Sequence, residues 1–325
     1  MLRAAGRGAV QLAESRDALI AFIRRQQHPD GGFRGRSEDS DLYYAVFAIE
    51  SLIALEAELP QEAIAQYLAT FGSGEGLDLV HLACLARCWA DLGEHWHSLG
   101  PGPGLPPHDR AGLLRRIEGH RSADGGFAQE PGADQGTVYG CFLAFGALQD
   151  VSSAGFSPYP PRSRYGLKAA LQTGIIRCLS HLRAPDGGFA NERGLPAGST
   201  PATAAAITLL RHLRRPVEPA LPEWLLARHD PSGGFRATPA APIPDLLSTA
   251  TALHALAGLG VPLDAVRQPC LDFVGGLWNA EGGFQGSGLD DSPDCEYTYY
   301  GLLAFGHLAG ESAPDAPQKA ADAPR

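Results

Sequence analysis

Basic residues are scarce in this sequence, and they form no run. The 325 residues include 36 Asp and Glu against 26 Lys and Arg, which gives a formal net charge of −10. Nucleic-acid binding depends on basic side chains that neutralise phosphates. The composition therefore argues against a nucleic-acid partner.

Long apolar segments are also missing. The longest ones are interrupted by Gly, His and Thr, and no segment has the pattern of a signal peptide or of a membrane-spanning helix. The six cysteines show no paired spacing, so we expect reduced thiols rather than a disulfide framework. Together these features predict a cytoplasmic protein with no membrane span.

The sequence does contain a repeated marker, Gly-Gly-Phe. It occurs five times, ending at Phe33, Phe127, Phe189, Phe235 and Phe284. The spacings of 94, 62, 46 and 49 residues reduce to one unit of about 47, because 94 is twice 47 and the spacing of 62 contains an insertion. A sixth, degenerate unit is expected near Val80. Repeats of this length are typical of helical hairpins, which must stack to form a core.

An apolar, Ala- and Leu-rich segment follows the marker in each repeat, after a polar loop and an acidic residue. Examples are 42–55 after Asp41, 137–148 after Asp134, 248–259 after Asp245 and 298–308 after Asp294. An Asp directly before such a segment is a helix N-cap signal, because its carboxylate accepts hydrogen bonds from first-turn N–H groups. Since these segments are apolar nearly all round, we expect them to be inner helices.

More amphipathic segments precede the markers, for example 16–27 and 166–182, and we expect these to be outer helices. The two glycines would end an outer helix and turn the chain, and the Phe would pack between neighbouring repeats. The pattern predicts an all-α fold, a single (α/α)6 toroid in which six helical hairpins close into a ring over residues 1–310. A polar, disordered tail is expected at 311–325.

The marker segments carry a family resemblance. Asp30-Gly31-Gly32-Phe33-Arg34-Gly35-Arg36 and Glu281-Gly282-Gly283-Phe284-Gln285-Gly286 each lead to Asp-x-x-Tyr or Asp-x-x-x-Thr. They resemble the repeat shared by protein prenyltransferase β subunits and squalene/terpene cyclases. The resemblance implies a closed α/α toroid whose central cavity, lined by the starts of the inner helices, binds an isoprenoid. A single toroid is more similar to the β subunit, because the cyclases typically use two.

The resemblance also implies a zinc site, but its ligand pattern is incomplete here. Related prenyltransferases bind catalytic zinc with Asp-x-Cys in one repeat and Asp-x-x-His in the next. The matching segments begin at Asp245 and Asp294, and Leu247 and Tyr297 stand where the Cys and the His would be. The basic pair that would hold a diphosphate is missing after Phe235. We therefore expect no zinc.

Class II terpene cyclases of the same superfamily carry Asp-x-Asp-Asp-Thr, whose middle Asp protonates an alkene. In the last repeat, Asp294-Cys295-Glu296-Tyr297-Thr298 places Glu296 in register with that acid. Such an acid must stay protonated in a dry, apolar pocket. Glu296, Asp294 and Tyr297 are thus the catalytic candidates. The alternative is that Glu296 only favours the helix dipole from the first turn.

Residues at the starts of the other inner helices would complete a polar collar around one end of the cavity. The candidates for substrate contact are Tyr44, His81, Thr137, Ser248 and Asp245, with Tyr297 closing the collar. The repeated Asp residues are equally well explained as N-caps, each contributing about 1 kcal/mol.

Three further groups have a functional and a structural interpretation. Asp290 and Asp291 begin a D-D-x-x-D string that could hold Mg²⁺, although Gly288 and Pro293 predict a loop where the string needs a helix. His81, Cys84 and Cys88 share one helical face, as metal ligands or as core residues. Four arginines follow the markers, as phosphate ligands or as solvated charges. These are Arg34, Arg36, Arg193 and Arg236.

Three interpretations of function follow. The first is an isoprenoid enzyme of the prenyltransferase β-subunit type that acts on a prenyl diphosphate without the zinc site, and it predicts a helical partner subunit. The second is a non-standard terpene cyclase that uses Glu296 as its acid and acts alone. The third is a non-catalytic isoprenoid-binding or scaffold protein. The single toroid favours the first.

Overall fold

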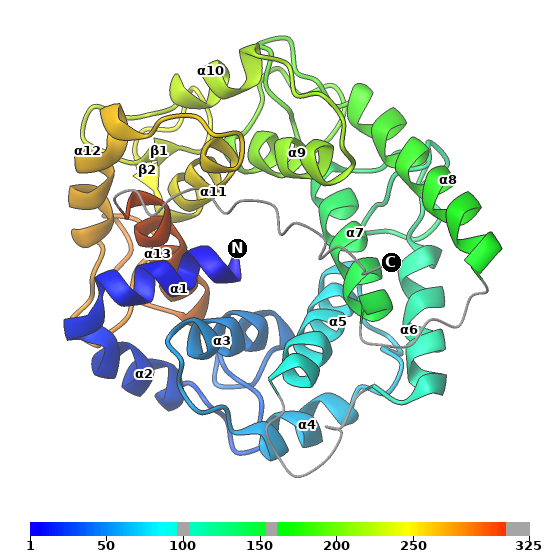
Figure 1. The fold of residues 1–325 in the computed structure, drawn as a ribbon, viewed down its shortest axis with the longest axis horizontal. Coiled ribbons are helices and arrows are strands. Elements are labelled where there is room, and N and C mark those ends of the chain that lie inside the picture. The colour runs from blue at the N-terminus through cyan, green and yellow to red at the C-terminus, as the bar shows by residue number, and fades with distance from the viewer. Residues whose placement is uncertain (96–104, 154–160, 310–325) are drawn as a thin grey trace, which may run out of the picture.

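The computed structural model describes residues 1–95, 105–153 and 161–309, and it forms a ring of helices in two concentric layers (Figure 1). The inner layer contains α3 (Leu42–Ala54), α5 (Leu79–Glu94), α7 (Val138–Ser153), α9 (Thr200–His212), α11 (Leu246–Gly258) and α13 (Cys295–Leu308). The outer layer contains α2 (Arg16–Arg25), α4 (Gln61–Ala69), α6 (Pro107–Gly119), α8 (Pro161–Ser180), α10 (Ala220–Leu226) and α12 (Asp264–Gly275). Each inner helix contacts the next, and α13 returns to contact α3. The predicted all-α toroid is confirmed.

Little else in the described residues is regular. Strands β1 (Phe235–Arg236) and β2 (Pro244–Asp245) pair antiparallel in one turn, and a short 3-10 helix (Ala13–Ser15) joins α1 (Leu2–Gln11) to α2. None of the described helices is long and apolar enough to cross a bilayer. The extent of the domain, 1–310, stays a prediction, and the tail at 311–325 lies outside the described residues.

The Gly-Gly-Phe markers are the turns between outer and inner helices. The first glycine of the marker has a positive φ, for example 96° at Gly31, where a side chain is strained. A Cβ on Gly31 would also lie 2.1 Å from the carbonyl oxygen of Ala63 in the next outer helix. All five marker phenylalanines are at most 5% exposed. Glycine therefore lets neighbouring hairpins approach closely, and Phe fills the seam between them, as predicted.

Side-chain caps fix where most inner helices begin. Asp41, Asp78, Asp245 and Asp294 each accept a hydrogen bond from a backbone N–H of the first turn. Asp78 belongs to the degenerate repeat, whose inner helix begins at Leu79 as expected. The cap predicted at Asp134 is wrong, because the Thr137 hydroxyl accepts the Gly140 N–H at 2.8 Å instead. A cap must lie directly before the first turn, and Asp134 is three residues too early.

Helix α1 has no counterpart among the sequence-based predictions. It lies against α13 and α3, and its first residue is near the middle of the ring (Figure 1). A Cβ on Gly8 would lie 1.9 Å from the Leu302 carbonyl oxygen, and one on Gly306 would lie 1.6 Å from that of Ala4. The backbones of α1 and α13 are therefore in direct contact, along the C-terminal half of α13.

Candidate functional site

One face of each inner helix points toward the middle of the ring. Along α11 the half-buried residues Leu247, Thr251 and His254 are followed by Gly258, at offsets of four, seven and eleven residues that select one helical face. On α7 the same offsets connect Tyr139 with residues 143, 146 and 150. We call the surface formed by these faces the lumen. Solvent reaches it, since Tyr139 is 42% exposed.

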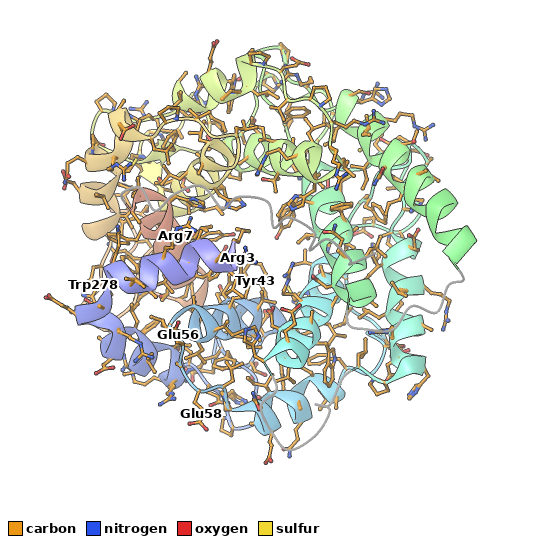
Figure 2. All side chains as sticks on the ribbon, in the orientation of Figure 1. Arg3, Arg7, Tyr43, Glu56, Glu58 and Trp278 are labelled. Carbon is orange, nitrogen blue, oxygen red and sulfur yellow. The ribbon has the colours of Figure 1, made fainter. Side chains whose placement is uncertain are left out.

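The lumen begins at the residue two positions after each N-cap. We call these six residues the first layer of the lumen: Tyr43, Val80, Tyr139, Pro201, Leu247 and Glu296. Figure 2 shows Tyr43 on the inner side of α3. The Glu296 carboxylate is among the groups that raise the pKa of Tyr139, although α13 and α7 are not neighbours in the ring. These two side chains therefore lie within electrostatic range of each other, although they are on helices that are not neighbours.

Glu296 lies among tyrosines in this first layer. The Tyr43 hydroxyl donates a hydrogen bond of 2.6 Å to Glu296 Oε1. Burial raises the pKa of Glu296 to about 7, against the Tyr43 hydrogen bond, which lowers it. Burial and the nearby Glu296 carboxylate also raise the pKa values of Tyr43 and Tyr300, so both phenols stay protonated at neutral pH. The arrangement is a carboxyl group that is half protonated near pH 7, with a fixed donor on one oxygen.

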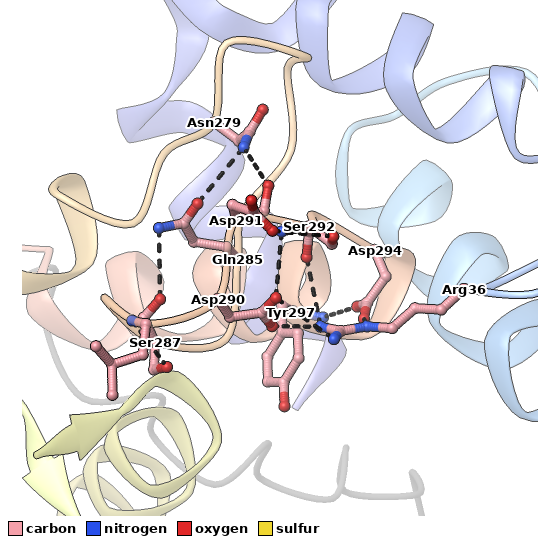
Figure 3. A network of polar contacts seen from close by, with 10 residues as sticks. Arg36, Asn279, Gln285, Ser287, Asp290, Asp291, Ser292, Asp294 and Tyr297 are labelled. Carbon is pink, nitrogen blue, oxygen red and sulfur yellow. Dashed lines mark hydrogen bonds and ion pairs between the residues drawn. The ribbon is translucent and has the colours of Figure 1, made fainter.

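Asp294 and Tyr297 belong to a polar network at the rim of the lumen (Figure 3). Arg36 donates from Nε to Asp294 Oδ2 at 3.0 Å and from Nη2 to Asp290 Oδ2. The guanidinium carbon lies 5.6 Å from the centre of the Tyr297 ring. Asp294 also accepts the Tyr297 N–H at 2.8 Å and is 2% exposed. Arg36 thus connects the first repeat to the last. It also forms an ion pair with the carboxylate of Asp290, which was a candidate Mg²⁺ ligand.

His81 is held between two N-caps. Its Nδ1 is 2.7 Å from Asp78 Oδ1 and its Nε2 is 3.2 Å from Asp41 Oδ1. Hydrogen bonds that the ring donates to the Asp41 and Asp78 carboxylates raise the pKa of His81 to about 9, so the ring carries a positive charge at neutral pH. Tyr44 packs edge-on against Tyr43, with ring centres 5.4 Å apart. Both predicted collar residues therefore lie beside the first layer of the lumen.

The other collar candidates cap the inner helices or form hydrogen bonds with a capping residue. Thr137 caps α7, and Asp245 caps α11 by accepting the Ser248 N–H at 2.7 Å. The Ser248 hydroxyl donates to Asp245 Oδ2 at 2.8 Å, and Ser248 is fully buried. A role in substrate binding stays a prediction for these residues.

Metal ligation has little support in the part of the chain that the structure describes. Within it, no group of three or more His, Cys, Asp or Glu side chains is arranged to hold a metal ion. Cys84 and Cys88 are buried free thiols, and burial raises the pKa of both. Asp291 lies in a loop, where its backbone oxygen accepts a hydrogen bond from Asn279 at 3.0 Å. These side chains fit core packing and loop structure.

The opposite half of the lumen, where the inner helices end, is charged. Arg87 lies 3.1 Å from Asp150 Oδ2 and 3.8 Å from Glu50 Oε1, and so connects α3, α5 and α7. On the other side, His254 Nδ1 and His307 Nε2 are 3.0 Å apart. Burial lowers the pKa of His254 to about 2 and that of His307 to about 3, so both rings are neutral at pH 7. None of these groups was singled out from the sequence.

Comparison with known proteins identifies the fold family. The prenyltransferase alpha-alpha toroid domain matches residues 5–158 and 203–318, well over half of the sequence. The chain belongs to this toroid family. No curated protein sequence matches this toroid significantly.

Solved structures similar to this toroid have several functions. A variant of the type II terpene cyclase MstE from Scytonema, bound to geranylgeranyl dihydroxybenzoate, matches with a TM-score of 0.56 and 14% identity, covering 93% of this chain and 97% of that one. Candida albicans protein geranylgeranyltransferase-I complexed with GGPP matches with a TM-score of 0.58 and 15% identity, covering 90% of each chain. A glycosidase in complex with glucose matches with a TM-score of 0.51 and 14% identity, covering 93% and 96%. At these identities the similarity establishes the fold alone.

The match to MstE invalidates one inference that was drawn from the sequence. A single toroid was expected to favour a prenyltransferase β subunit over a cyclase. Because this chain covers 97% of the MstE chain, a type II terpene cyclase also consists of one such unit. The number of toroids therefore does not distinguish the two activities, and the site must do so.

Proposed function

We propose that this protein is an acid-initiated isoprenoid cyclase or isomerase in which Glu296 protonates the substrate. The observation that carries the proposal is the position of Glu296: it faces the lumen, its pKa is raised to about 7 by burial, and Tyr43 donates to its Oε1. This is the second of the three interpretations from the sequence. It requires neither zinc nor a partner subunit.

The hydrogen bond from Tyr43 has a chemical consequence. A general acid is effective when it is protonated before the reaction and stabilised as the conjugate base afterwards. Burial supplies the first condition, since it raises the pKa of Glu296. Tyr43 supplies the second, because its O–H stabilises the carboxylate that forms when the proton leaves from Oε2.

Aromatic rings next to Glu296 suit the cation that protonation creates. When the acid transfers its proton to a substrate double bond, the carboxylate remains and a carbocation forms on the substrate. The ring centres of Tyr43 and Phe47 are 5.1 Å apart, and those of Phe47 and Tyr300 are 5.6 Å apart. The faces of such rings attract cations, contributing about 0.5–2 kcal/mol each. Loss of a proton from another carbon ends the reaction as an isomerisation or cyclisation.

The interpretation as a prenyl diphosphate transferase has weaker support. Three of the four candidate phosphate ligands are engaged by carboxylates of the chain itself. Arg34 pairs with Glu38, Arg36 with Asp290 and Asp294, and Arg236 with Asp230. A diphosphate at this rim would have to displace those carboxylates and would meet the Asp N-caps of the inner helices, whose negative charges repel it.

The test is acceptor-free product analysis. The purified protein is incubated with C10, C15 and C20 prenyl alcohols, carboxylates and diphosphates, with Mg²⁺ or with EDTA, and the products are identified by mass spectrometry and NMR. We expect a product of unchanged mass but altered connectivity, formed equally well in EDTA. Glu296→Gln should lower the rate at least about 100-fold, since a general acid contributes that much or more.

A matched variant separates chemistry from folding. Glu223→Gln changes the same residue type on the outer helix α10, and it should leave the rate unchanged. If Glu296→Gln turns over as fast as the wild type, Glu296 is not the acid. Bound but unaltered isoprenoid under every condition would instead support the non-catalytic interpretation, and turnover only with an added partner subunit would support the transferase.

A further inference from the structure

The two ends of the lumen differ in charge. The end where the inner helices begin has an excess of carboxylates, with Arg36 and His81 as their cationic partners. At the other end, an arc of basic groups follows four neighbouring elements. It consists of Arg211 and His212 on α9, His254 on α11, His307 on α13 and Arg7 on α1. Figure 2 shows Arg7 on α1, where its Nε donates to the Gly306 carbonyl oxygen at 3.1 Å. The acidic groups Glu50 and Asp150 lie on the opposite half, paired with Arg87.

Arg211 is the distinctive member of this arc. Its guanidinium makes no hydrogen bond or ion pair with any described residue, and burial lowers its pKa. A Cβ on Gly258 would lie 2.0 Å from Arg211 Nη1 and 2.5 Å from its guanidinium carbon. Since Gly258 is on the lumen face of α11, the guanidinium lies against that face, in space that glycine leaves free. A partly desolvated cation that has no counter-charge among the described residues favours an anionic ligand.

The neighbouring histidine pair adds a hydrogen-bond donor. Both rings are neutral, and one N–H is used between His254 Nδ1 and His307 Nε2. Two neutral imidazoles carry two N–H groups in total, so one N–H remains outside this contact whichever tautomers are present. Arg211 and the pair lie close together, because the guanidinium lies against Gly258, which is one helical turn after His254 on the same face of α11.

We infer that this end of the lumen binds an anionic head group, a carboxylate or a phosphate, of an amphiphilic substrate. The isoprenoid chain would extend from Arg211 toward Glu296, so the inference deepens the function proposed above and rests on it for the tail. Glu296 and His307 are eleven residues apart on one face of α13, which separates the head group from the acid by about 16 Å. Between them the lumen is lined by uncharged side chains such as Phe47, Thr251 and Tyr300. The substrate would thus be protonated at the end remote from its head group.

Calorimetric titration with three ligands of equal tail tests this inference. Farnesol, farnesoic acid and farnesyl monophosphate differ only in the head group. We expect at least one of the two anions to bind about tenfold or more tightly than the alcohol, as one charge-assisted hydrogen bond suffices for that ratio. A larger ratio for the acid identifies a carboxylate substrate, and a larger ratio for the phosphate identifies a phosphorylated one.

Variants locate the head group. Arg211→Gln should remove the preference for the anions, whereas Arg215→Gln, an exposed arginine just beyond α9, should keep it. Gly258→Ala should weaken anion binding as well, because it displaces the guanidinium while keeping its charge. Circular dichroism and thermal melting confirm that each variant is folded.

Two results would overturn the inference: equal affinity for the alcohol and both anions, or a preference that survives Arg211→Gln and disappears in Arg36→Gln, which would place the head group at the other end. Glu296→Gln should retain the anion preference in calorimetry. Failure of the proposed chemistry would appear only in turnover and is therefore distinguishable from failure of the head-group site.

Discussion

The hydroxyl of Tyr43 and the carboxylate of Glu296 are joined by a 2.6 Å hydrogen bond, although 253 residues separate them in the sequence. Tyr43 is in the first inner helix and Glu296 is in the last, and these helices are neighbours because the ring closes between them. The proposed acid and the residue that stabilises its conjugate base thus come from opposite ends of the repeat array.

Replacing Tyr43 by Phe should move the pH dependence of turnover. A reaction that needs protonated Glu296 slows as pH rises through its pKa of about 7. The Tyr43 hydrogen bond lowers that pKa, so its removal raises the pKa and shifts the decline to higher pH. The pH profile of kcat measures this shift. Tyr67→Phe, on the outer helix α4, is the control, and an unmoved profile in Tyr43→Phe would contradict the assigned role.

His81 should stabilise the fold below about pH 9 and not above it. Hydrogen bonds that it donates to the carboxylates of Asp41 and Asp78 raise its pKa from 6.5 to about 9. A raised histidine pKa contributes stability that is fully present below the unfolded value and is lost as pH rises through the folded value. His81→Gln should therefore lower the Tm at pH 6 and leave it near the wild-type value at pH 10. A Tm difference of the same size at both pH values would argue against this charge.

The pair His254 and His307 should have the opposite effect. Burial lowers both pKa values, to about 2 and about 3, so the unfolded chain binds protons that the folded protein excludes. Stability should then fall as pH decreases below about 6.5, the ordinary histidine pKa. In the double variant His254→Gln and His307→Gln, the decline between pH 6.5 and 4 should be shallower. Denaturant titrations at several pH values measure it, and identical slopes would refute the linkage.

Gly8→Ala should loosen α1 from α13. A Cβ at this position would lie 1.9 Å from the Leu302 carbonyl oxygen, so the helices must separate, at a cost of about 1–3 kcal/mol or more in the free energy of unfolding. Gly93→Ala in α5 is the matched control, because no atom lies within 4 Å of its added Cβ. It should stabilise by about 0.5–1 kcal/mol through helix propensity. Chemical denaturation compares the two, and equal effects would contradict the tight crossing.

The fold could be predicted because its signals are local. Gly-Gly-Phe, the Asp caps and the apolar period recur in the sequence, and each has a physical cause within one hairpin. Helix α1 was missed because it precedes the first Gly-Gly-Phe hairpin and its buried face consists of Ala4, Ala5, Gly8 and Ala9, small residues rather than the large apolar ones of the other helices. Their function is close approach to another backbone, and a sequence pattern does not reveal a partner almost 300 residues away.

The candidate site was only partly predictable, for a reason of helical phase. Glu296 is two residues after its cap, whereas Tyr44, His81, Ser248 and Tyr297 were taken at three residues after theirs. A helix turns 100° per residue, so these side chains point away from the direction of Glu296. Applying the offset of Glu296 to every repeat would have found Tyr43 and Tyr139. The charged end of the lumen could not be found this way, because the proposed role of Arg211 depends on its contact with Gly258, which only the folded ring brings about.

Closure of the ring by Tyr43 with Glu296, by Arg36 with Asp294 and by Gly8 with Leu302 means that the first and the last hairpin need each other. During synthesis on a ribosome, five of the six inner helices would exist before the proposed acid is made, and a chain that stopped before Asp294 would have none of the three contacts. The proposed reaction would therefore have no active assembly intermediate, because its cation would form only inside a ring that is already complete.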